Sequence, residues 1–99
     1  MHACYLLREG SIRCCREDIG RHNALDKVIG WALLRQEDLS RCALFTTGRM
    51  PTDMVRKAIR AGVPILASKT YPTSLGLELA KEAGLTLITI RPGLDPKVW

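Results

Sequence analysis

The apolar positions of the chain form one helical stripe and several short continuous runs. Between residues 22 and 35 the apolar side chains recur at spacings of three and four, which predicts a helix with one buried face. Three mostly apolar runs have the length of buried strands, and they cover 42–46, 63–67 and 85–90. The pattern therefore predicts a domain that mixes helices with buried strands.

Glycine and proline residues set the boundaries of the other elements. Gly10 lies in a polar turn between two short predicted strands, which favours an N-terminal hairpin. Proline residues open two further helices, and an Ala-Gly pair ends each of them. The remaining predicted segments are strands 3–7 and 11–16, helices 51–61 and 72–83, a loop at 36–41 and a tail at 92–99.

A weak internal repeat indicates how these elements are connected. The segments RAGVPILAS and EAGLTLITI both pass from the end of a helix through Ala-Gly into a strand, and the two pairs lie 22 residues apart. Repeated helix, tight turn and strand is typical of right-handed parallel units in a three-layer α/β domain. We therefore expect a single domain over residues 1–99, with a mixed sheet that includes the hairpin.

Length and composition indicate the size class, the compartment and the cysteine oxidation state to expect for this domain. The chain has 99 residues, of which 46% are hydrophobic, as expected for one small globular domain that an oligomer would stabilise. No apolar run approaches the roughly 20 residues that span a membrane, and no secretory signal is recognisable, so we expect a cytoplasmic protein without membrane contact. The cysteines lack C-x-x-C spacing and are expected to be reduced thiols: Cys4, Cys14, Cys15 and Cys42.

The net charge of +5 favours an anionic partner, such as a phosphate group. The arginine and lysine residues are dispersed along the chain, and only 5% of residues are aromatic. This combination argues against nucleic-acid binding, which uses clustered cations and stacking side chains.

Polar residues follow the predicted parallel strands at the edge where ligands bind in α/β sheets. The first group, Thr46-Thr47-Gly48-Arg49, ends one strand, and Ser68-Lys69-Thr70 ends the next. Pro72-Thr73-Ser74 then begins a helix, whose free N–H groups suit phosphate. Hydroxyl groups beside Arg49 and Lys69 would complete an anion site, with Gly48 allowing close approach. The alternative for Thr73 and Ser74 is helix capping.

A second cluster lies on the first two turns of the predicted helix at 22–35. Asn23, Asp26, Lys27 and Gly30 share one helix face, and His22 lies four residues before Asp26. We expect Asp26 to orient His22 or Lys27. Glycine inside a helix costs roughly 1 kcal/mol against alanine, which suggests close packing or a ligand there. The alternative is a solvated face with ordinary ion pairs.

The spacing of the cysteine and histidine residues gives little support for a metal site or for covalent catalysis. Zinc sites use ligand spacings such as C-x-x-C or H-x-E, and neither occurs in this chain. No sequence feature brings a cysteine to a histidine as a nucleophile pair. We therefore expect neither a metal site nor catalytic residues.

Four segments of the chain resemble the FdhD/NarQ family, the formate dehydrogenase accessory sulfurtransferases. They are REDIGRHNALDKVIGWAL, TTGRMPTDMVRKAIRAGVPILAS, YPTSLGLELAKEAGLTLITI and RPG. The resemblance implies a cytidine-deaminase-like α/β/α fold and a cytoplasmic homodimer. It also implies sulfur transfer from a cysteine desulfurase to the molybdenum cofactor, in its bis-guanine-dinucleotide form, which then passes to formate dehydrogenase.

The resemblance extends from about His2 to Gly93 and implies a cofactor-binding C-terminal domain. The family carries sulfur on a C-x-x-C that lies upstream of the matching region, and no cysteine of this chain matches that pair. Thr47 stands where the family usually has serine. The resemblance and the strand-end pattern together give the positions that are expected to bind or shape a cofactor site: Arg21, His22, Asn23, Asp26, Lys27, Thr47, Gly48, Arg49, Ser68, Pro72, Thr73 and Ser74. The alternative is a ligand-free dimerisation or scaffold domain that complements a separate subunit.

Overall fold

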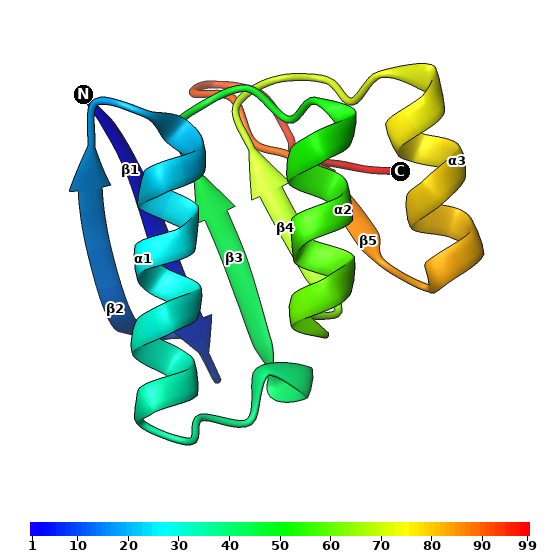
Figure 1. Ribbon diagram of the computed structural model, residues 1–99. Helices are drawn as coiled ribbons and strands as arrows, with labels where there is room; N and C mark the ends of the chain where they lie inside the picture. Colours follow the sequence, from blue (N-terminus) through cyan, green and yellow to red (C-terminus); the bar gives the residue numbers. More distant parts are fainter.

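The computed structural model describes residues 1–99 as a six-stranded sheet with three α-helices (Figure 1). The strands are β1 (His2–Arg8), β2 (Ser11–Asp18), β3 (Cys42–Thr46), β4 (Ile65–Ser68), β5 (Thr86–Thr89) and β6 (Lys97–Val98). The helices are α1 (Arg21–Leu34), α2 (Thr52–Ala61) and α3 (Ser74–Ala83), with a short 3-10 helix at Leu39–Arg41.

The sheet is mixed, with the strand order β2-β1-β3-β4-β5-β6. Strands β3, β4 and β5 are parallel, whereas β1 is antiparallel to both of its neighbours and β6 is antiparallel to β5. The hairpin between β1 and β2 turns at Glu9 and Gly10, whose φ angles are 52° and 79°. Glycine adopts this left-handed conformation without strain, which explains why Gly10 marks the turn in the sequence.

The three helices cover one face of the sheet. Each of the crossovers β2-α1-β3, β3-α2-β4 and β4-α3-β5 runs in the same direction across the sheet, so right-handed connections place the helices on the same side. Figure 1 shows α1 and α2 in front of the strands, and α3 packs against α2. One core of buried side chains lies between helices and sheet, with Leu6, Leu44, Leu66 and Leu87 at its centre.

The expected α/β class, the mixed sheet and the N-terminal hairpin are confirmed. The expected α/β/α architecture has a helical layer on each face of the sheet, and residues 1–99 form one of these two layers. Strand β3 has the predicted bounds, whereas α2 and α3 begin one and two residues later than predicted. The sequence pattern missed β6 in the predicted tail, because a two-residue exposed strand carries no apolar signal.

The opposite face of the sheet is apolar and has no helix over it. Tyr5 pairs with Phe45 in the β1–β3 register, and Phe45, Ala67 and Ile88 continue the row across β3, β4 and β5. None of these side chains belongs to the core under the helices. A cavity of about 340 Å³ on this face is lined by Tyr5, Leu7, Ile12, Phe45, Thr47 and Lys69.

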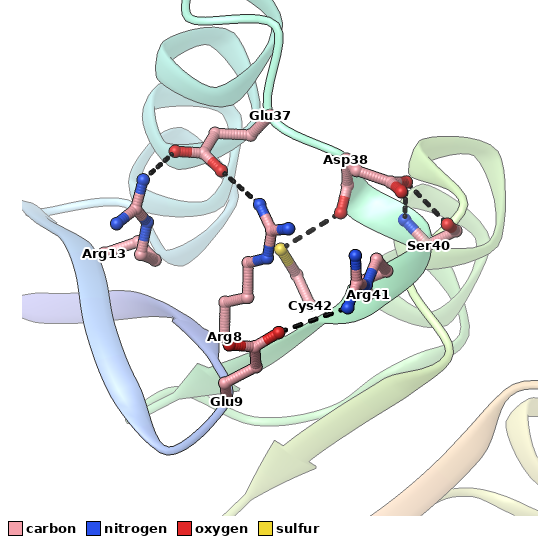
Figure 2. A network of polar contacts seen from close by, with 8 residues as sticks. All are labelled: Arg8, Glu9, Arg13, Glu37, Asp38, Ser40, Arg41 and Cys42. Carbon is pink, nitrogen blue, oxygen red and sulfur yellow. Dashed lines mark hydrogen bonds and ion pairs between the residues drawn. The ribbon is translucent and has the colours of Figure 1, made fainter.

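An ion-pair network closes the other end of the sheet, where β1 ends and β3 begins (Figure 2). Glu37 accepts hydrogen bonds from Arg13 at 2.7 Å and from Arg8 at 3.5 Å, and only 8% of its side chain is exposed. Arg41 pairs with Glu9 at 3.2 Å in the same region. This network joins the hairpin to the segment after α1 and leaves the carboxyl ends of the parallel strands free for a site.

None of the helices combines the length and apolar character that crossing a bilayer requires.

Candidate functional site at the carboxyl edge of the sheet

The positive ends of all three helices gather at one edge of the sheet. Strands β3, β4 and β5 end at this edge and α1, α2 and α3 begin there, as Figure 1 shows. Backbone N–H groups in the first turn of a helix have no partner within the helix and carry a partial positive charge. The two predicted clusters, one after the strands and one at the start of α1, therefore lie on the same edge.

A chain of buried hydrogen bonds fixes the loops that follow β3 and β4. The Ser68 hydroxyl donates to the Gly48 carbonyl at 2.9 Å and accepts from the Thr70 N–H at 3.2 Å. Thr46 Oγ1 accepts from the Gly48 N–H at 3.1 Å. Ser68 is completely buried, so its hydroxyl braces the site rather than meeting a ligand.

A cavity of about 270 Å³ opens between these loops and the helix starts. Its lining consists of Arg49, Met50, Pro51, Thr70, Tyr71 and Thr73. Arg49 is exposed and pairs with no carboxylate of the chain. No side chain caps the start of α2, where Pro51 is the N-cap residue. The cavity thus combines an unpaired guanidinium with uncapped backbone N–H groups.

Helix α3 begins differently, because Thr73 caps it. Thr73 Oγ1 accepts a hydrogen bond from the Gly76 N–H at 3.0 Å and lies 3.2 Å from Thr52 Oγ1. Ser74 is exposed and Pro72 is half-buried beside it. The structure therefore gives Thr73 a capping role and also places it on the cavity wall.

Gly48 is needed for the packing of Arg21 rather than for a ligand. A Cβ atom at position 48 would lie 2.9 Å from Arg21 Cβ and 3.3 Å from His2 Nδ1. No sequence pattern marks His2 as a site residue, although the antiparallel register of β1 and β3 brings it to the level of Gly48. Arg21 Nε and His22 Nδ1 are buried atoms without a hydrogen-bond partner in the chain. They provide two unused polar groups beside the loop.

The prediction that Asp26 orients His22 or Lys27 is wrong. Both carboxylate oxygens of Asp26 accept from Lys57 on α2, at 2.9 and 3.0 Å. Lys27 pairs instead with Asp18 at 2.8 Å, and His22 Nε2 lies 4.0 Å from the Asp53 carboxylate. The packing of α1 against β2 and α2 supplies these partners, which the spacing within one helix cannot reveal.

The face that these residues were expected to share is therefore divided. Asn23 donates to Asp18 at 3.4 Å, so it belongs with Lys27 on the side of β2. Arg21 lies against Gly48 in the loop after β3, whereas His22 lies near Asp53 at the start of α2. Gly30 has open space beside it, since a Cβ there would meet no atom within 4 Å. The expected close packing at Gly30 is absent within the chain.

The pKa shifts of one carboxylate and three thiols bear on the chemistry of this chain. Hydrogen bonds from Lys27 and from the Gly20 N–H lower the pKa of Asp18 from 3.8 to about 2. Burial raises the pKa of the Cys4 thiol to about 12, and burial also raises the pKa of Cys14 and Cys42. These thiols stay protonated near neutral pH, and the thiolate is the nucleophile in sulfur chemistry. The structure contains no group of three or more metal-ligating side chains.

Comparison with known proteins identifies the relatives of this chain. The sequence profile of the FdhD/NarQ family matches residues 1–98. The chain belongs to the FdhD/NarQ family. The sulfur carrier protein FdhD of Mycolicibacterium paratuberculosis is 46% identical over 90 residues, which are 89% of this chain and 33% of that protein. Its counterpart in Nocardia farcinica is 48% identical over 101 residues, covering 100% of this chain and 36% of that protein.

Solved structures agree with this assignment. A protein described as a formate dehydrogenase accessory protein from Desulfotalea psychrophila superposes with a TM-score of 0.87 at 45% identity, over 99% of this chain and 44% of that one. The dCMP deaminase of cyanophage S-TIM5 has a TM-score of 0.55 at 16% identity, over 87% of this chain and 77% of that one, and shows a shared fold. The chain spans about a third of the length of the curated relatives that it matches.

Proposed function

We propose that this FdhD/NarQ chain binds the guanine-nucleotide part of the molybdenum cofactor at the carboxyl edge of its sheet. The observation that carries the proposal is the cavity of about 270 Å³, where Arg49 lies beside the uncapped start of α2. A helix N-terminus with a nearby guanidinium is a favourable environment for phosphate. Arg49 would hold the phosphates, while Pro72, Thr73 and Ser74 shape the neighbouring wall.

The donor set of this edge fits a dinucleotide. Its exposed donors are guanidinium, hydroxyl and backbone N–H groups, which donate hydrogen bonds to phosphate oxygens, whereas the exposed Asp53 carboxylate in the first turn of α2 opposes an anion there. The partnerless Arg21 Nε and His22 Nδ1 add two buried polar groups at the start of α1, where Arg21 lies beside Gly48. When bound, the cofactor supplies the molybdenum centre that receives sulfur. The residues of this chain would bind and orient the nucleotide ends.

The partners of this binding step follow from the family. We propose that a cysteine desulfurase supplies the sulfur in the cytoplasm and that formate dehydrogenase receives the sulfurated cofactor. The relatives carry the names sulfur carrier protein and formate dehydrogenase accessory protein, which support a role in sulfur transfer for formate dehydrogenase. The buried thiols of Cys4, Cys14 and Cys42 are unsuited to carry sulfur, and we propose that a C-x-x-C of the family type carries it.

A calorimetric titration with GDP tests the proposal, with AMP as the control nucleotide. Saturable GDP binding and at least tenfold weaker AMP binding would support a guanine-nucleotide site. Absence of heat with both nucleotides, in a protein whose circular dichroism shows the native fold, would refute the proposal.

The uncovered apolar face favours a second candidate, a dimerisation or scaffold function without a ligand. Tyr5, Phe45 and Ile88 form a row on that face, outside the core. These three side chains are half-buried, and an apolar sheet face without a covering layer commonly marks a contact with another chain. We propose a homodimer that uses this face, and such a homodimer is compatible with nucleotide binding at the sheet edge.

A further inference from the structure

Residues that follow β5 pack against Tyr71 and form an aromatic cluster with it beside the candidate nucleotide cavity. Tyr71, on the cavity wall, meets Trp99 with the ring centroids 5.4 Å apart and an angle of 70° between the ring planes. The Arg91 guanidinium lies 4.7 Å from the Tyr71 ring centroid, and Lys97 Nζ lies 5.1 Å from the Trp99 ring centroid. Two cations and two aromatic rings thus form one packed group.

Hydrogen bonds tie this group to the sheet and to the loop that carries Tyr71. The Trp99 indole N–H donates to Thr89 Oγ1 at 3.0 Å, and the Thr89 hydroxyl donates in turn to the Thr70 carbonyl at 2.8 Å. The Trp99 backbone N–H donates to the Leu87 carbonyl at 3.0 Å. Arg91 Nε donates to the Lys69 carbonyl at 3.3 Å. The C-terminal residue therefore fixes the backbone immediately before Tyr71.

Despite these contacts, Tyr71 remains 57% exposed. The Arg91 guanidinium lies over the Tyr71 ring and Trp99 packs against that ring at a steep angle, while the exposed part of the residue faces solvent and the cavity. A rigid aromatic ring loses little conformational entropy when a planar ligand stacks on it. Arg49 and the start of α2 lie on the same cavity, where the phosphates of a nucleotide would be held.

We propose that Tyr71, braced by Trp99 and Arg91, is the wall against which the base of the bound nucleotide stacks. This inference rests on the proposed function, because it assigns the base end of the same site. Arg49 binds the phosphate end and is indifferent to the base. Tyr71 makes the affinity depend on a planar base, and the last residue of the chain thereby contributes to ligand binding without touching the phosphates.

Titrations with GDP and with inorganic pyrophosphate separate the two ends of the site. The Tyr71→Ala variant should bind GDP about tenfold more weakly, within the range measured for loss of one aromatic–base stack. Its affinity for pyrophosphate should be unchanged. Tyr71→Phe keeps the ring and should retain GDP affinity within about twofold. Because Tyr71 is largely exposed, both variants are expected to fold, and thermal unfolding checks this.

Tryptophan fluorescence provides an independent readout. The chain has two tryptophans, so Trp31→Phe leaves Trp99 as the only one. In this background GDP should quench the Trp99 emission, whereas pyrophosphate should leave it unchanged. Loss of this quenching in Tyr71→Ala would agree with the proposed stack.

Three outcomes would be adverse, and they are distinguishable. If Tyr71→Ala binds GDP as tightly as the parent protein does, the stacking inference is overturned and the proposed function stands. If GDP binds without any change in Trp99 emission, the base lies elsewhere, and the inference is again overturned. If the folded parent protein binds neither GDP nor pyrophosphate, the proposed function fails and the inference fails with it.

Discussion

The Ser68 hydroxyl donates a hydrogen bond of 2.9 Å to the main-chain carbonyl of Gly48, and both residues are buried. This bond joins the loops that follow two adjacent parallel strands. Because Ser68 Oγ also accepts from the Thr70 N–H, one side chain fixes both margins of the cavity. Arg49 directly follows Gly48, and Tyr71 directly follows Thr70.

The variant Ser68→Ala should therefore be less stable. It leaves the Gly48 carbonyl and the Thr70 N–H without this partner, and a buried polar group without a partner costs about 1–3 kcal/mol. Urea denaturation measures the free energy of unfolding. Ser74→Ala, which removes an exposed hydroxyl, is the control and should change stability by less than about 0.5 kcal/mol. Equal stabilities of the two variants would contradict the bracing role.

Two glycine substitutions should have opposite effects. Gly48→Ala places a Cβ atom 2.9 Å from Arg21 Cβ, so the helix start must move, with a cost of about 1–3 kcal/mol. Gly30→Ala meets open space inside a helix, and alanine should stabilise that helix by up to about 1 kcal/mol. Thermal unfolding of both variants is the measurement. A destabilised Gly30→Ala would show that another chain packs against α1.

The sequence predicted the fold well because the core strands and helices carry strong local signals. Strand β3 has the predicted bounds because its apolar run is short and is bordered by polar residues. Strand β6 escaped prediction because Lys97 and Val98 are exposed and pair only through their backbone with Ile88 and Thr89. The 3-10 helix after α1 depends on a local Asp38–Ser40 contact inside a polar segment that reads as a loop.

The site was predicted in outline for a related reason. Residues that follow parallel strands must meet at one edge of the sheet, so the sequence alone predicts that the strand-end loops lie close together. Contacts between helices could not be placed in this way. Spacing within α1 predicted that Asp26 would contact His22, four residues earlier, or the adjacent Lys27. The packing of α1 against α2 instead gives Asp26 the partner Lys57, 31 residues further along the chain. Trp99 was also missed, since its role depends on the pairing of β6.

Replacing Arg49 should weaken nucleotide binding. Arg49→Ala removes the only arginine on the cavity wall, and loss of a hydrogen bond to a charged group costs about 1.5–3 kcal/mol. Calorimetry with GDP should therefore show an affinity at least about tenfold lower. Arg60→Ala makes the same charge change at the other end of α2 and is the matched control. An unchanged affinity in Arg49→Ala would remove this residue from the site.

Stability should fall in acid partly because of Asp18. The pKa of Asp18 is about 2 in the folded chain, below its ordinary value of 3.8, so the unfolded chain binds the proton more readily. The stabilisation by Asp18 is fully present above pH 4 and is lost as the pH falls toward 2.

The variant Asp18→Asn tests this pH dependence. It keeps an oxygen that can accept from the Gly20 N–H but does not titrate. The free energy of unfolding of Asp18→Asn should decline less steeply than that of the parent protein between pH 4 and 2. Asp95→Asn, which removes an exposed carboxylate without an ion pair, should follow the parent curve. Parallel curves for Asp18→Asn and the parent protein would argue against the depressed pKa.

The uncovered sheet face predicts how a homodimer would respond to mutation. Phe45 lies on that face, 6.0 Å from the Tyr5 ring, and outside the core, so Phe45→Asp should leave the monomer folded. A buried, unpaired carboxylate would nevertheless oppose association through the face. Light scattering should give the parent protein twice the chain mass of 11.0 kDa and Phe45→Asp the mass of one chain. Leu34→Asp, at an exposed position at the end of α1, should stay dimeric. A monomeric parent protein, or a Phe45→Asp variant that remains dimeric, would show that this face does not hold two copies together.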